Sequence, residues 1–164
     1  MSIFDNSLEP LKRMHRKARE RRLLATQNVK DSLARRLEGD QEAFDHSPVS
    51  FSPDPAQHSV GILLVHGFTG SPHSMRPLAQ HFMELGYAVE MPLLTGHGTH
   101  WKDLRDSTYE QWLASAEQGY RRLADQGLRV VVVGMSMGGT VATHLSARLP
   151  VAGTVLINPY MVDV

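Results

Sequence analysis

Apolar runs alternate with amphipathic stretches over the second two thirds of the chain. Residues 60–65 read VGILLV, a continuous apolar run of the kind found in strands buried on both faces. The expected strands cover residues 60–65, 87–91, 130–133 and 153–157. The expected helices cover residues 75–85, 108–124 and 138–149. Because helices of ten or more residues separate the strands, we expect right-handed crossovers and a parallel sheet with helices on both faces.

The pattern differs before residue 60, where we expect a basic helical extension over 1–43 and a linker or irregular edge over 44–59. Ten of the 17 basic residues lie within 11–36, where apolar positions recur every four residues. A membrane-surface or nucleic-acid arm is one interpretation of this stretch. We favour a solvated helical extension, because no stacking aromatics are interleaved with the charges. We therefore expect no nucleic-acid partner and no membrane contact by residues 11–36.

Composition narrows the class of protein. The 164 residues carry 17 basic and 17 acidic side chains and no cysteine, so disulfides and thiolate metal sites are excluded. The N-terminus lacks the pattern of a signal peptide, and no apolar run approaches the ~18 residues that a membrane-spanning helix needs. We expect a cytoplasmic protein that needs no cofactor.

The segment GMSMGG, residues 134–139, follows a run of four valines and precedes an expected helix. This context is typical of a nucleophile elbow, in which a strained strand-to-helix turn lifts the serine hydroxyl above the sheet edge. Side chains two residues before and after Ser136 would collide in so tight a turn, which accounts for Gly134 and Gly138. A small-residue turn needed only for packing is the alternative. We interpret Ser136 as a nucleophile.

A second glycine-rich segment, HGFTGSP, follows the first expected strand at residues 66–72. Acyl transfer needs two donors aimed at the developing oxyanion, one from such a loop and one from the residue after the nucleophile. These donors would be the backbone amides of Phe68 and Met137. We interpret His66 and Gly67 as structural parts of the loop, since His66 precedes the nucleophile in chain order and a catalytic histidine is expected after it.

Other functions suggested by these glycines and histidines fit less well. The turn at Ser136 has a serine where a dinucleotide site needs the second glycine of G-x-G-x-x-G, and neither glycine-rich turn has the Gly-Lys-Ser/Thr end of a phosphate loop. His97 and His100 follow the second expected strand, yet no carboxylate or cysteine accompanies them at ligand spacing. We expect no metal site and interpret His97 as a loop residue that shapes the pocket.

The ordered segments HGFTGSP, LLTGHG and GMSMGG, with Trp112 on the intervening helix, resemble the α/β-hydrolase superfamily. The similarity is greatest to bacterial carboxylesterases and monoacylglycerol-lipase-like proteins, including the serine aminopeptidase S33 type, and covers about residues 58–164. The resemblance implies the N-terminal part of an α/β-hydrolase fold over 60–164. It also implies a small-molecule ester substrate, Ser136 as nucleophile, and Phe68 and Met137 at the oxyanion hole.

The family pattern also places an acid and then a histidine after the serine. Only His144 and Asp163 follow Ser136, and His144 would lie ~12 Å along the helix axis, out of reach of the hydroxyl. We therefore expect a chain truncated before the triad is complete. A thioesterase, peptidase, acyltransferase or C–C hydrolase of the same fold stays open, as does a non-catalytic binding module.

Overall fold

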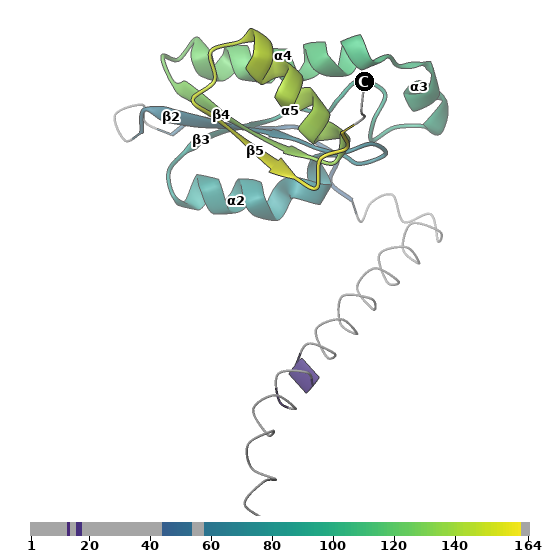
Figure 1. The fold of residues 1–164 in the computed structure, drawn as a ribbon, viewed down its shortest axis with the longest axis horizontal. Coiled ribbons are helices and arrows are strands. Elements are labelled where there is room, and N and C mark those ends of the chain that lie inside the picture. The colour runs from purple at the N-terminus through teal and green to yellow at the C-terminus, as the bar shows by residue number, and fades with distance from the viewer. Residues whose placement is uncertain (1–12, 14–15, 18–43, 54–57, 162–164) are drawn as a thin grey trace, which may run out of the picture. The chain divides into compact units, whose positions relative to one another are not determined.

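The computed structural model describes residues 13, 16–17, 44–53 and 58–161. The chain divides into two units, Met1–Phe44 and Asp45–Val164. Nearly all of the extension expected over 1–43 lies outside the described residues. The three residues described there, Arg13, Arg16 and Lys17, are helical and exposed. The second unit holds all the strands of the described structure (Figure 1).

Five strands form a single sheet in the order β1-β3-β2-β4-β5. The strands are β1 (Val49–Phe51), β2 (Val60–Val65), β3 (Ala88–Met91), β4 (Arg129–Met135) and β5 (Gly153–Ile157). The four longer strands run parallel, which confirms the expected architecture. β1 is antiparallel to β3 and adds an edge strand inside the segment that we expected to be a linker or irregular edge.

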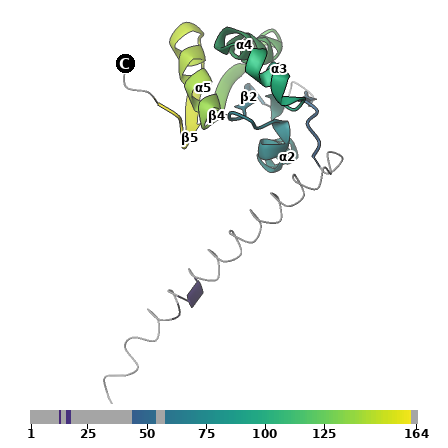
Figure 2. The same cartoon turned by 90° about the vertical axis from the view of Figure 1, so that its right-hand side faces the viewer.

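Helices cover both faces of the sheet. They are the 3-10 helix η2 (Pro72–Met75), α2 (Arg76–Glu84), α3 (Trp101–Asp106), α4 (Tyr109–Ala124) and α5 (Met137–Arg148). Figures 1 and 2 show α4 and α5 on one face and α2 on the other. Within the described residues, none of these helices is both long enough and apolar enough to cross a bilayer.

Successive side chains along a strand point to opposite faces of the sheet and form two hydrophobic cores, one on each face. Leu63 and Val65 pack with α4 and α5, whereas Ile62 and Leu64 face α2. Strands buried on both faces read as continuous apolar runs, which explains VGILLV. The helix expected over 75–85 is divided between η2 and α2 and ends at Glu84, and Leu85, the C-cap of α2, is 51% exposed.

The register brings the chemistry-bearing segments to one edge of the sheet. Val65 pairs with Gly134, and Met135 pairs with Ile157, so β2, β4 and β5 end together. The loops that follow these strands therefore meet where ligands bind in open α/β sheets.

Candidate active site

Ser136 lies between the end of β4 and the first turn of α5. Its backbone has φ 53° and ψ −122°, a conformation that L-residues rarely adopt, and its side chain is exposed. The hydroxyl makes no capping hydrogen bond to the helix that follows. Strain at a strand-to-helix turn is what the expectation of a nucleophile elbow requires.

Three backbone hydrogen bonds, two of them long-range, hold the strained turn in place. The Ser136 N–H donates to the carbonyl of Ile157 at 3.0 Å. The Ser136 carbonyl accepts from the amides of Gly139, at 2.8 Å, and Tyr160, at 3.1 Å. The end of β5 and the segment after it therefore bond to both the N–H and the carbonyl of Ser136, although nothing in the sequence of this region marks it as part of the candidate site.

Glycines on both sides of the serine leave no room for side chains. A Cβ on Gly134 would lie 2.2 Å from the carbonyl oxygen of Gly138, within the turn itself. A Cβ on Gly138 would lie 2.2 Å from the carbonyl oxygen of Val65, so this second glycine is required by contact with β2. Because Gly138 has no side chain, α5 packs closely against the end of β2. The N-terminus of α5 therefore lies beside the 66–70 loop.

The His66 side chain connects the 66–70 loop to the loop that follows β3. The Leu94 N–H donates to His66 Nε2 at 3.1 Å, so Nδ1 carries the proton and donates to the Gly67 carbonyl at 3.0 Å. Both ring nitrogens are occupied, and the side chain is fully buried. Desolvation lowers the pKa of His66 from 6.5 to about 4, with a smaller lowering by His97, against a raising by the Gly67 hydrogen bond. The neutral imidazole of His66 therefore holds the two loops together through its hydrogen bonds.

The Gly67 carbonyl and the Phe68 N–H belong to one planar trans peptide unit, so fixing one fixes the other. That carbonyl also accepts from the Gly70 amide at 3.1 Å, and Thr69 between them has φ 56°. Neither the Phe68 nor the Met137 amide donates a hydrogen bond to another described residue. Two unused N–H groups of this kind, one of them in the first turn of a helix, can receive a developing negative charge.

Aromatic rings line the site beside the 66–70 loop. The His97 ring centroid lies 5.0 Å from His66, 5.4 Å from Trp112 and 6.1 Å from Phe68. His97 Nδ1 donates to the Thr95 carbonyl at 3.2 Å, while its buried Nε2 has no partner among the described residues. Desolvation lowers the pKa of His97, which favours the neutral form of the ring.

Of the two residues considered for a triad after Ser136, the described one, His144, does not reach the serine. His144 Nδ1 lies 3.1 Å from the Tyr109 hydroxyl, two helical turns along α5 from Ser136. Asp163 is outside the described residues. The Ser136 hydroxyl makes no hydrogen bond to a described histidine, and the described residues contain no cluster of three or more side chains able to hold a metal ion.

A model described as the alpha/beta hydrolase family matches residues 62–164, well over half of the chain. The chain belongs to this family. The expected fold and the resemblance in the glycine-rich segments are thereby confirmed. Two of those segments, around Ser136 and at the end of β2, lie together at the candidate site of this alpha/beta hydrolase chain.

Named relatives of this hydrolase chain act on lipids and esters. The thermostable monoacylglycerol lipase of Bacillus sp. (strain H-257) is 50% identical over 100 residues, which are 60% of this chain and 40% of that protein. The carboxylesterase of Bacillus subtilis (strain 168) is 33% identical over 95 residues, 57% of this chain and 39% of that protein. The chain thus spans about two fifths of the length of these relatives.

A solved structure from work on LipS and LipT, two metagenome-derived lipolytic enzymes, has a TM-score of 0.65 and 36% identity to this chain. The likeness covers 70% of this chain and 46% of that one.

Proposed function

We propose that this chain carries the nucleophile and the oxyanion hole of a serine hydrolase that acts on carboxylic esters. The observation that carries the proposal is the conformation of Ser136, strained at φ 53°, exposed and held by three backbone hydrogen bonds. A backbone held against its own preference indicates a function other than packing. The monoacylglycerol lipase and carboxylesterase relatives support the choice of ester chemistry.

In this proposal the Ser136 Oγ attacks the acyl carbonyl carbon, and the negative charge that develops on the carbonyl oxygen is received by the Phe68 and Met137 amides. Collapse of the tetrahedral intermediate breaks the bond to the leaving alcohol, which takes up the proton that the Ser136 hydroxyl gave up, and leaves an acyl-serine. Water then hydrolyses the acyl-serine to the carboxylic acid and returns a proton to Ser136. His66 cannot accept the serine proton, because both of its nitrogens are already hydrogen-bonded. We assign the general base to none of the described histidines.

A fluorophosphonate probe tests the nucleophile directly. The 164-residue chain is incubated with the probe and digested, and adducts are located by mass spectrometry. Ser136 is expected to label about a hundredfold faster than other serines, which is the rate effect of a single oxyanion-hole donor. Ser136→Ala should abolish the adduct, whereas Ser59→Ala, at another exposed serine, should leave it unchanged.

The alternative of a non-catalytic binding module makes a different prediction. In that case Ser136 labels no faster than Ser59, and p-nitrophenyl butyrate is not cleaved faster by the chain than by its Ser136→Ala variant. That pair of results overturns the proposal.

A further inference from the structure

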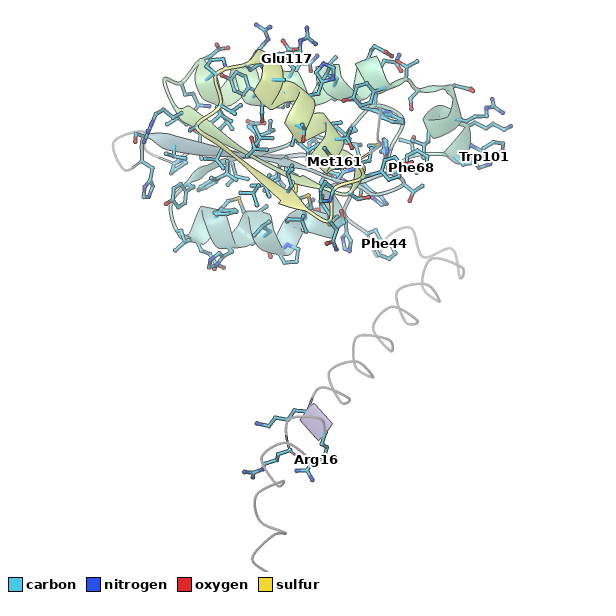
Figure 3. All side chains as sticks on the ribbon, viewed as in Figure 1. Arg16, Phe44, Phe68, Trp101, Glu117 and Met161 are labelled. Atoms are coloured by element: carbon cyan, nitrogen blue, oxygen red, sulfur yellow. The ribbon has the colours of Figure 1, made fainter. Side chains whose placement is uncertain are left out.

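The four most exposed large apolar side chains of the described structure lie at the same edge of the sheet as Ser136. They are Phe68 (56% exposed), Trp101 (61%), Tyr160 (63%) and Met161 (60%), here called the apolar rim. Phe68 follows β2, Trp101 lies in the connection that leaves β3, and the other two follow β5. These strands are parallel, so their carboxyl ends share one edge. Figure 3 shows Phe68, Trp101 and Met161 toward the same end of the sheet.

Trp101 is set among cations on α3. The Arg105 guanidinium lies 5.3 Å and the Lys102 ammonium 5.8 Å from the centroid of its ring, and the His100 ring lies 5.6 Å away. A capping box holds the helix start, because the His100 side chain accepts from the Lys102 amide and Asp103 accepts from the His100 amide. The indole is therefore presented to solvent from an ordered helix.

The carboxylates of the same helix are already engaged. Asp106 accepts two hydrogen bonds from Arg105, of 2.7 and 3.0 Å, and Asp103 accepts one from the His100 amide at the start of the helix. Lys102 forms no ion pair with a described residue, and its ammonium lies against the Trp101 ring. The surface thus offers an amphipathic indole beside a cation that is free to bind an anion.

An exposed indole with neighbouring basic side chains is the combination that proteins place at the headgroup level of a bilayer. The ring enters the boundary between headgroups and acyl chains, and a lysine binds phosphate while its stem lies on apolar surface. Because Trp101 is mostly exposed and lies beside Lys102, this surface suits a partner with both an apolar and an anionic part.

We propose that the apolar rim is a docking surface for the phospholipid–water interface, with Trp101 inserting at headgroup level and Lys102 binding lipid phosphate. The docking does not depend on Ser136 being a nucleophile. If the proposed function also holds, docking brings the mouth of the site to the phase in which lipid esters are dissolved.

The two tryptophans of the chain allow a local measurement, since Trp112 is half-buried and Trp101 is exposed. The full chain is titrated with large unilamellar vesicles of phosphatidylcholine, alone or with three parts in ten of phosphatidylglycerol. The emission of Trp101, isolated in Trp112→Phe, should shift to the blue and be quenched by lipids brominated on the acyl chain. In Trp101→Phe the remaining emission should not respond to lipid.

Binding strength separates the residues involved. Trp101→Ala should weaken vesicle partitioning about tenfold, which corresponds to losing the burial of one large apolar side chain. Lys102→Glu should weaken binding to the anionic vesicles more than to the zwitterionic ones. Leu85→Ala, at a side chain 51% exposed at the end of α2, is the matched control and should bind as the parent does.

Three results would overturn the proposal. The first is Trp101 emission that does not respond to lipid, even if the chain binds vesicles, because binding would then occur elsewhere, for example through residues 11–36. The second is Trp101→Ala that partitions as strongly as the parent. The third is a blue shift that rises with protein concentration in the absence of lipid, which would assign the rim to contact with a second copy.

Discussion

Gly67 and Ser136 touch so closely that a methyl group on the glycine would lie 3.1 Å from the serine Cβ and 3.6 Å from its Oγ. The contact joins the loop after β2 to the turn after β4. It brings the peptide unit that carries the Phe68 amide beside the candidate nucleophile, which is the juxtaposition that acyl transfer requires.

Gly67→Ala is expected to impair the site more than the fold. The added methyl lies 3.2 Å from the Met135 carbonyl as well as against Ser136, so the loop must retreat by a few tenths of an ångström. We expect a cost of about 1 kcal/mol in the free energy of unfolding and a fall of about tenfold in fluorophosphonate labelling of Ser136. Gly153→Ala, whose methyl meets only Val131 at 3.9 Å, should change neither quantity. Equal labelling of the two variants would contradict this prediction.

The main elements of the fold could be predicted because each long strand and helix has its own periodicity. The two elements that were not predicted, β1 and α3, are too short to show a periodicity. β1 has three residues in a segment rich in proline and serine, and α3 has six. The cap of α3 is a histidine, which is outside the usual set of N-cap residues, so no start signal was visible.

The site could be predicted only where its requirements are local. The clash that makes Gly134 a glycine lies within five residues of sequence, and it was expected. The bonds from Ser136 to Tyr160 and from His66 to Leu94 join residues that lie far apart in the chain. Such bonds arise from the order of strands in the sheet and leave no pattern in either segment.

Gly138→Ala should destabilise the whole domain. Its methyl would lie 2.2 Å from the Val65 carbonyl oxygen and 2.6 Å from that of His66, and neither backbone group can move without breaking the end of β2. We expect a loss of more than about 3 kcal/mol in urea unfolding, or failure to fold. Gly153→Ala again serves as the control, with a change within about 0.5 kcal/mol. A Gly138→Ala variant as stable as the parent would mean that α5 can shift away from β2.

Ser136→Gly is expected to stabilise the chain while removing its nucleophile. Glycine adopts φ 53° without the backbone strain of about 1–3 kcal/mol that other residues have there. Glycine also raises the conformational entropy of the unfolded chain, which lowers the free energy of unfolding by up to about 1 kcal/mol. The net gain over Ser136→Ala should be about 1 kcal/mol in urea unfolding. At Ser59, which has no positive φ, glycine should instead be less stable than alanine. The same order of stability at both positions would argue against strain at Ser136.

Acid should weaken the fold through His66. Its pKa is about 4 in the folded chain and 6.5 when unfolded, so between these values the unfolded chain binds more protons, and stability falls as the pH is lowered. Through this difference in pKa, the free energy of unfolding is about 3 kcal/mol higher above pH 6.5 than near pH 4. His66→Asn, which keeps a donor for the Gly67 carbonyl, should flatten the slope of unfolding free energy between pH 6.5 and 4.5. The slope is compared with that of His58→Asn, a change at a histidine outside the candidate site whose Nε2 is hydrogen-bonded to the Leu85 carbonyl. A slope that is unchanged in His66→Asn would assign the acid sensitivity to other groups.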